Sequence, residues 1–206
     1  MNNGMKHYSG MLDRAEQEAL VAELRLGVAR APLFTPLMPR TGRPFSVRMT
    51  NLGSLGWVSD RNGYRYQSIH PDMGTLWPEM PQAILNIWGK VSGYTHPPQA
   101  CLVNFYQGGA KMGLHQDKDE EDFIAPVVSI SLGDTAVFRF GGTTRGGKTS
   151  TLKLSSGDVL VMGGESRLCF HGIDRVNVGT STLLKEGGRI NLTLRRVTKP
   201  ELHCDG

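Results

Sequence analysis

Hydrophobic residues recur at two different spacings in the two halves of the chain. In the N-terminal half they recur every three to four residues within two segments, which predicts amphipathic helices over residues 14–29 and 81–92. Asp13 and Glu16 can form a capping box at the start of the first helix. From about residue 100 the period falls to two, the period of a half-buried strand. The strands predicted in this way cover residues 101–106, 126–132, 136–140, 150–154, 158–162, 168–170 and 189–196.

The turns between these strands are short and rich in glycine. The chain has 26 glycines among 206 residues, without the Gly-X-Y period of collagen. Glycine pairs such as Gly141-Gly142 and Gly187-Gly188 mark tight turns. Strands that recur about every ten residues are typical of a sandwich, a barrel or a jelly roll. Because no internal repeat and no linker divides the chain, we expect a single, mainly β (α+β) domain.

Composition and charge narrow the class of protein. Hydrophobic residues make up 39% of the chain and charged residues 20%, which permits a core and excludes a disordered chain. No apolar run approaches the roughly 20 residues of a membrane helix, and the N-terminus lacks the apolar centre of a signal peptide. The three cysteines form no Cys-x-x-Cys pair. These features predict a soluble, cytoplasmic protein without a membrane partner, and a net charge of +4 is compatible with a polyanionic one.

His115, Asp117 and His171 form the first candidate site. In an extended segment positions i and i+2 face the same side, so the side chains of His115 and Asp117 converge. His171 follows at the end of another predicted strand. Two imidazoles and one carboxylate are the facial triad of non-haem Fe(II) oxygenases, which leaves positions open for substrate and O₂. Taken alone, a His-x-Asp pair is more often surface polarity, and a single histidine is more often structural.

A second candidate site lies on the last predicted strand. Polar residues occupy every second position there and are expected to share one face: Arg189, Asn191, Thr193 and Arg195. Burying two arginines is unfavourable unless anions compensate them, and a small dicarboxylate would match their guanidinium groups bidentately. Asn104 and Tyr106 offer neutral donors on an earlier strand. The alternative is a solvated strand face, which would not need such uniform alternate positions.

Several short motifs occur together in one order along the chain. They are Asn104-Phe-Tyr106, His115-Gln-Asp117-Lys-Asp119, Phe140-Gly-Gly142, Gly163-Gly-Glu-Ser-Arg167, His171-Gly172 and Arg189-x-Asn-x-Thr-x-Arg195. In this combination they closely resemble the AlkB family of Fe(II)- and 2-oxoglutarate-dependent nucleic-acid dealkylases, over roughly residues 45–197. The resemblance implies one dioxygenase domain over residues 1–206 with a double-stranded β-helix (jelly roll) at roughly 100–197. It also implies an N-terminal nucleotide-recognition lid at roughly 30–70, which we call the lid.

The resemblance implies a role for each motif residue. Fe(II) would be bound by the triad of His115, Asp117 and His171. The residues implied around 2-oxoglutarate are Asn104, Phe105, Tyr106, Arg189, Asn191, Thr193 and Arg195, with Arg189 at the distal carboxylate. The residues implied at the substrate are Trp57, Tyr64, Arg65, Tyr66, Asp119 and Arg145, and the apolar wall would come from Met112, Val127 and Met162. Residues 38–45 depart from the family's aromatic pattern.

The activity implied by the resemblance is oxidative demethylation of alkylated nucleobases, of the 1-methyladenine and 3-methylcytosine type. It would be coupled to 2-oxoglutarate decarboxylation, would use O₂ and would release formaldehyde, which is a DNA-repair reaction. The expected partner is single- or double-stranded DNA, with RNA as a second candidate, and the expected state is a monomer. Two alternatives stay open on the same scaffold. One is a 2-oxoglutarate hydroxylase of a protein or small molecule, and the other is a non-catalytic metal-binding jelly roll, which would leave Arg189 and Arg195 unexplained.

Overall fold

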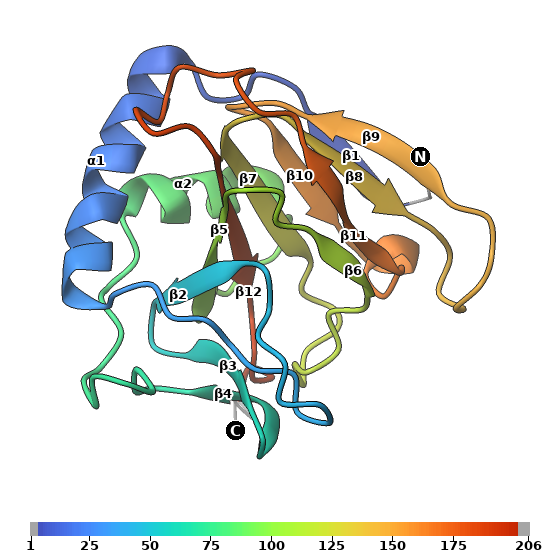
Figure 1. Ribbon diagram of the computed structural model, residues 1–206. Coiled ribbons are helices and arrows are strands. Elements are labelled where there is room, and N and C mark those ends of the chain that lie inside the picture. The colour runs from blue at the N-terminus through green and yellow to red at the C-terminus, as the bar shows by residue number, and fades with distance from the viewer. Residues whose placement is uncertain (1–3, 202–206) are drawn as a thin grey trace, which may run out of the picture.

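Two antiparallel β-sheets face each other and form the body of the protein (Figure 1). The computed structural model describes residues 4–201. The six-stranded sheet has the order β1 (Met5–Tyr8), β10 (Val159–Met162), β7 (Val127–Gly133), β12 (Arg189–Arg195), β5 (Ala100–Tyr106) and β2 (Arg48–Leu52). The four-stranded sheet has the order β6 (Met112–His115), β11 (His171–Val176), β8 (Ala136–Phe140) and β9 (Ser150–Leu154). Most neighbouring strands are not consecutive in the chain, and the predicted jelly roll is confirmed.

Two helices cover the outer face of the six-stranded sheet (Figure 1). They are α1 (Arg14–Arg30) and α2 (Gln82–Val91), within one residue of the predicted ranges. The predicted capping box is present, because Glu16 N donates to Asp13 Oδ1 at 2.8 Å and Asp13 N donates to Glu16 Oε2 at 2.9 Å. The helices and the sheet share one apolar core that includes Leu20, Leu24, Ile84, Trp88, Val128, Ile130, Leu192 and Leu194.

The alternation of side chains along β12 positions the candidate site. Ile190, Leu192 and Leu194 pack toward the helices. The residues between them point into the space between the two sheets, where they line a cavity: Arg189, Asn191, Thr193 and Arg195. The opposite faces predicted from the period of two are therefore confirmed.

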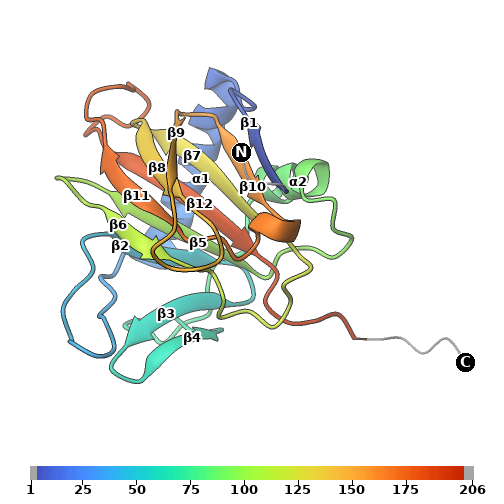
Figure 2. The same ribbon diagram turned by 90° about the vertical axis from the view of Figure 1, so that its right-hand side faces the viewer.

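The lid lies beside the open end of the two sheets (Figures 1 and 2). Its centre is a hairpin of β3 (Gly56–Asp60) and β4 (Gly63–Gln67), preceded by a long extended segment. A small core of Ala31, Val58 and Trp77, with Phe34 against it, holds these parts together. Gly56 is required here, because a Cβ atom on it would lie 2.5 Å from the Trp77 ring. The sequence pattern indicated only turns and aromatic residues in this region, and its strands were not predicted.

The predicted strand at residues 168–170 is wrong. These residues form a turn after the short 3-10 helix η1 (Gly164–Ser166), and β11 begins at His171. Cys169 N donates to Ser166 O and Phe170 N donates to Gly142 O, so neither amide joins a sheet ladder. The apolar run has the pattern of a strand because Cys169 is buried between the sheets, where the turn itself contributes to the core. The other six predicted strands agree with the structure to within one residue at each end. Outside the lid, β1, β6 and β11 were not predicted.

Candidate metal centre and cavity

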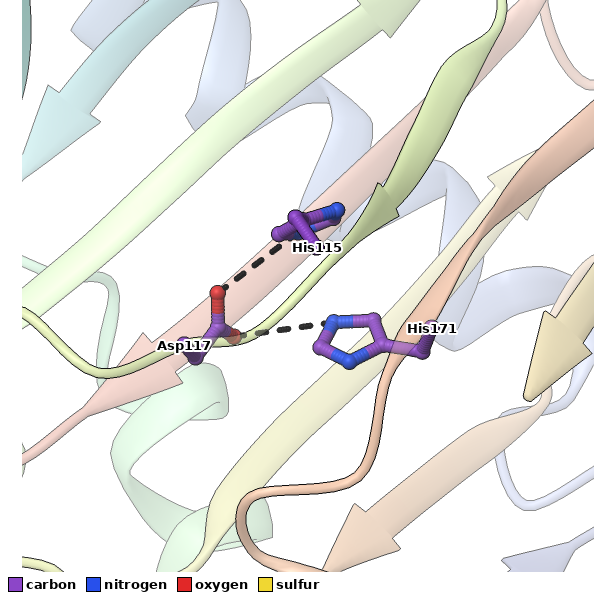
Figure 3. A group of neighbouring side chains, drawn as sticks. All are labelled: His115, Asp117 and His171. Atoms are coloured by element: carbon purple, nitrogen blue, oxygen red, sulfur yellow. Dashed lines mark ion pairs between the residues drawn. The ribbon is translucent and has the colours of Figure 1, made fainter. Parts of the chain in front are cut away.

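Three side chains converge between the sheets, as predicted (Figure 3). His115 is the last residue of β6 and His171 the first of β11, and the two face each other in the antiparallel register. Asp117 follows two residues after the first histidine. Its Oδ1 lies 3.6 Å from His115 Nε2, and its Oδ2 lies 3.8 Å from His171 Nε2. One ligand atom from each residue lies within 4.8 Å of the others, a spacing that a single metal ion can bridge.

Backbone carbonyls fix the orientation of both imidazoles. His115 Nδ1 lies 2.9 Å from Gly113 O, and His171 Nδ1 lies 3.0 Å from Cys169 O. A carbonyl can only accept, so the proton belongs on each Nδ1 and each Nε2 presents a lone pair to the centre. Burial, with the nearby His115, lowers the pKa of His171 to about 4, so this imidazole is neutral at physiological pH.

Arg195 forms an ion pair with the carboxylate of the triad. Its Nη2 lies 2.9 Å from Asp117 Oδ1, and its Nε donates to Asp117 Oδ2 at 3.2 Å. Burial would raise the pKa of the Asp117 carboxyl, but Arg195, together with His171 and His115, holds that pKa well below its usual range. Burial likewise opposes the charge of Arg195, yet Asp117, Tyr66 and Glu120 raise its pKa well above the ordinary value. Both groups are therefore charged.

A second buried ion pair holds the segment after the triad. Arg167 Nη2 donates to Glu120 Oε2 at 3.0 Å, and Arg167 Nη1 donates to the backbone oxygen of Asp117 at 2.7 Å. The other Glu120 oxygen accepts a hydrogen bond from Tyr66 OH of the lid, and it lies 3.4 Å from Arg195 Nε. Two carboxylates and two guanidinium groups thus balance in charge and connect the lid to the triad. The sequence motif contains Arg167, but local spacing assigns no role to it or to Glu120, because their 47-residue separation hides the pairing.

At the inner end of the cavity Arg189 has no anionic partner among the described residues. It is 1% exposed, its Nη2 donates to Ser131 Oγ at 3.0 Å, and its Nε and Nη1 have no hydrogen-bond partner. Its guanidinium carbon lies 5.4 Å from the centre of the Tyr106 ring. Burial lowers the pKa of Arg189 to about 10, which still leaves it charged at neutral pH. A buried cation with free donors requires an anion from a ligand.

The cavity between these two ends has a volume of about 640 Å³. Neutral polar residues line its middle, including Asn104, whose amide oxygen has no partner, and Asn191 and Thr193, which bond to each other at 3.0 Å. Met112 and Met162 supply apolar wall, whereas Val127 is fully buried and does not line the cavity. A metal at the triad and a dicarboxylate reaching Arg189 therefore fit the residues present.

Aromatic side chains of the lid form the mouth of the cavity. The rings of Trp57 and Tyr64 stack with centroids 5.5 Å apart at 18°. Trp57 Nε1 donates to Asp119 Oδ2 at 2.8 Å, which brings this carboxylate beside the aromatic pair. On the rim, Arg145 Nη2 donates to Leu114 O at 3.3 Å, and its guanidinium carbon lies 5.6 Å from the centre of the Phe170 ring. The structure thus brings these four predicted substrate residues to one opening.

Three predicted site residues do not line the cavity. Tyr66, predicted at the substrate, instead donates its hydroxyl to Glu120 and accepts from Arg195. Phe105 points to the other face of β5, where it lines a separate cavity with Ile190, because successive strand residues face opposite sides. Arg65 does not line the cavity either. Its Nη2 donates to Asp60 Oδ2 at 2.9 Å, and this ion pair occupies its charge.

Comparisons with known proteins agree with this geometry. Residues 4–195 match the model of the 2OG-Fe(II) oxygenase superfamily. A relative from Caulobacter vibrioides, alpha-ketoglutarate-dependent dioxygenase AlkB homolog, is 53% identical over 94% of this chain and 87% of its own. Alpha-ketoglutarate-dependent dioxygenase AlkB of Escherichia coli is 44% identical over 89% of this chain and 86% of its own. The solved structure of OsALKBH1 superimposes with a TM-score of 0.80 at 34% identity, covering 95% of this chain and 98% of that one.

Relatives that match a shorter part of the chain carry names that state a substrate. DNA N(6)-methyladenine demethylase ALKBH1C of Arabidopsis thaliana is 48% identical over 48% of this chain and 24% of its own. The tRNA demethylase abh1 of Schizosaccharomyces pombe is 40% identical over 65% of this chain and 46% of its own.

Fold and site together define a 2-oxoglutarate- and Fe(II)-dependent oxygenase, whose metal triad is His115, Asp117 and His171. Within that superfamily the chain belongs to the AlkB family.

Proposed function

We propose that this enzyme removes alkyl groups from nucleobases in nucleic acids by oxidation, as a DNA-repair dioxygenase. The names of its AlkB and demethylase relatives support this activity over hydroxylation of a protein or small molecule. The observation that carries the proposal is the mouth of the cavity. There a carboxylate, Asp119, and an aromatic stack, Trp57 and Tyr64, lie next to the metal triad.

When bound, Fe(II) and 2-oxoglutarate supply the oxidation, in which O₂ is consumed and 2-oxoglutarate becomes succinate and CO₂. The described residues would hold these groups: the triad would bind the metal, and Arg189, whose Nε and Nη1 have no partner, would bind the distal carboxylate of 2-oxoglutarate. The walls around the cosubstrate would be completed by Tyr106, Asn104, Asn191 and Thr193, and Arg195 would hold the metal ligand Asp117. When the alkyl group is a methyl group, it is hydroxylated and is then released from the base as formaldehyde.

Trp57 and Asp119 orient the base. An aromatic face offers stacking to a base that has left the helix, and a lesion that pairs poorly is easier to extrude. Methylation at N1 of adenine or N3 of cytosine makes the base cationic. The Asp119 carboxylate, held in place by Trp57 Nε1, can attract that charge and accept from the exocyclic amine.

The decisive assay is turnover on defined oligonucleotides. The enzyme is incubated with Fe(II), 2-oxoglutarate and ascorbate and with oligonucleotides carrying 1-methyladenine or 3-methylcytosine, and the products are weighed by mass spectrometry. We expect each lesion to lose about 14 mass units, which corresponds to replacement of a methyl group by hydrogen. Formaldehyde and succinate should form in equal amounts. Hydroxylation of added peptides or small molecules with intact lesions would contradict the proposal.

Asp119→Ala tests the role of charge in lesion choice. We expect this variant to keep iron binding and uncoupled succinate formation, since Asp119 is not part of the triad. It should lose most activity on 1-methyladenine, roughly 10-fold or more, and less on neutral 3-methylthymine. Equal losses on both lesions would refute the charge argument. No loss on either would remove Asp119 from the substrate site.

The proposal also covers the type of nucleic acid, the oligomeric state and the location of the protein. We take DNA as the substrate and RNA as the second candidate, and the same lesion in matched DNA and RNA oligonucleotides distinguishes them. The lid at roughly 30–70 acts on the substrate, and we take the protein to act as a monomer. Cys101 and Cys169 are buried free thiols, which favours a reducing, cytoplasmic location. In the described part of the chain no helix has the length and apolarity to cross a membrane.

A further inference from the structure

Two turns of the lid bring three arginines to the same edge of the cavity mouth. Arg40 and Arg43 belong to a turn that is closed by hydrogen bonds from Met38 N to Arg43 O and from Gly42 N to Met38 O, both 2.8 Å. Arg61 belongs to the turn between β3 and β4. A Cβ atom on Gly42 would lie 3.7 Å from Arg61 Nη2, so the Arg61 guanidinium lies against the first turn. The two turns are side by side in both views (Figures 1 and 2).

Hydrogen bonds fix the two turns to each other. Leu37 N donates to Ser59 O at 3.0 Å, and Ser59 Oγ donates to Leu37 O at 2.6 Å. Phe45 N donates to Pro36 O at 2.9 Å and ties the two ends of the first turn. The positions of the arginine backbones are therefore set by the fold.

The fold provides no anion for these guanidinium groups. Arg40, Arg43 and Arg61 are all exposed. Over residues 4–201 none of their guanidinium groups takes part in an ion pair or a side-chain hydrogen bond. The adjacent carboxylate, Asp60, is engaged by Arg65 at 2.9 and 3.0 Å. Three exposed cations close together without an acid create a local positive potential that favours an anionic partner.

The cluster is continuous with the catalytic cavity. Arg40 is one of the residues that line it, as is Arg145 from the loop between β8 and β9. The carboxylate Asp119 lines the same mouth beside Trp57. A strand whose base enters the cavity must pass its phosphates over this rim, so the base meets a carboxylate and the backbone meets arginines.

We propose that Arg40, Arg43 and Arg61, the lid arginines, bind the phosphates that flank the target nucleotide on the lid side. This inference rests on the proposed function and deepens it. The contacts are to the backbone, so they add affinity without sequence preference and extend the footprint beyond the flipped base. Two of the three arginines, Arg40 and Arg43, lie in the segment 38–45 that departs from the family's aromatic pattern.

The test compares two matched double variants. Arg43→Gln/Arg61→Gln removes two lid arginines that do not line the cavity. Arg14→Gln/Arg25→Gln removes two exposed arginines of α1, on the far side of the six-stranded sheet, and so changes the net charge equally. Arg40→Gln is then added to the first variant. Binding of a fluorescein-labelled 15-nucleotide single strand with one central 1-methyladenine is measured by anisotropy between 50 and 300 mM NaCl, about the range in which counterion release is well resolved.

The lid double variant is expected to lower the slope of log Kd against log salt concentration by about 1.4, or about 0.7 for each phosphate that an arginine no longer neutralises. Addition of Arg40→Gln should bring the total decrease in slope to about 2. The α1 variant should leave the slope unchanged. The ratio of kcat/KM on the 15-mer to kcat/KM on a methylated trinucleotide should fall at least about fivefold only in the lid variants.

An unchanged slope in the lid variants, or an equal decrease in the α1 variant, would overturn the assignment. The second result would mean that only the net charge of the protein affects binding, not the position of the arginines. Failure of the proposed function gives a different result. In that case the parent protein itself would release no formaldehyde from either the 15-mer or the trinucleotide.

Discussion

Arg189 and Arg195 lie on the same strand and the same face, yet they differ in their partners at the two ends of the cavity. At the metal end, Arg195 is satisfied within the protein by Asp117 at 2.9 Å, with Glu120 and Tyr66 close by. At the inner end, Arg189 has only the hydroxyl of Ser131, and two of its donors are unused. Burial is nearly complete for both, at 1% and 6% exposure, so desolvation does not separate them.

This difference distinguishes an arginine that is paired within the fold from one that can bind an anionic ligand. A buried guanidinium that has its carboxylates is part of the fold, and it also orients the iron ligand Asp117. A buried guanidinium without an anion stores an unfavourable interaction that a dicarboxylate relieves on binding. The opposite pKa directions, raised for Arg195 and lowered for Arg189, have this physical cause.

The largest expected effect comes from removing the anion at the metal end. Asp117→Ala takes away the only anionic ligand of the triad and leaves Arg195 with Glu120 alone among the nearby carboxylates. We expect Fe(II) affinity to fall about 1,000-fold or more, ~4 kcal/mol, and 2-oxoglutarate turnover to be lost. Equilibrium dialysis with Fe(II) under argon measures the affinity. Near-parental affinity would show that Asp117 is not a ligand.

Truncation of each arginine sharpens the comparison in the metal-free protein. Arg195→Met leaves Asp117 and Glu120 buried without their shared cation, so we expect a loss of roughly 3 kcal/mol in the free energy of unfolding. Arg189→Met removes an unpaired buried charge and should leave stability unchanged or raise it by about 1 kcal/mol. Urea unfolding with a chelator present measures both. Similar losses in the two variants would contradict the assignment of different partners.

Arg189→Lys probes the ligand-binding end without removing its charge. The lysine cannot present the planar pair of donors, so KM for 2-oxoglutarate should rise at least about tenfold, or about 1.4 kcal/mol. Binding of a methylated oligonucleotide, measured separately, should change little. If KM for 2-oxoglutarate stays at the parental value, the dicarboxylate binds elsewhere.

The smallest expected effect is at the link between the lid and the metal end. Tyr66→Phe removes the hydroxyl that donates to Glu120 and accepts from Arg195 Nη1. We expect a loss of about 1 kcal/mol in unfolding free energy and faster hydrogen exchange in β4, with Fe(II) affinity retained. Unchanged exchange in β4 would show that this contact does not hold the lid. Tyr64→Phe is the matched control, since Tyr64 is half exposed and stacks on Trp57.

Local pattern was sufficient for much of the fold. The capping box, both helices and six strands follow from residue spacing, because side-chain direction repeats every 3.6 residues in a helix and every two in a strand. The lid was not predictable in this way. Its short strands follow a long extended segment, and its core residues Phe34, Val58 and Trp77 come from separate segments. The strand at 168–170 failed because burial of an apolar turn between two sheets mimics a strand pattern.

The sequence by itself determined which residues carry the chemistry at the metal. It also determined the face of β12 on which Arg189 and Arg195 lie, since the period of two is a property of the extended backbone. The same rule excludes Phe105 from the cavity once Asn104 and Tyr106 point into it. Only the tertiary structure decided which arginine has a carboxylate, because Asp117 and Glu120 reach Arg195 across 78 and 75 positions of the chain. Such pairings depend on how the sheets are brought together, and nothing in the local spacing of either partner encodes them.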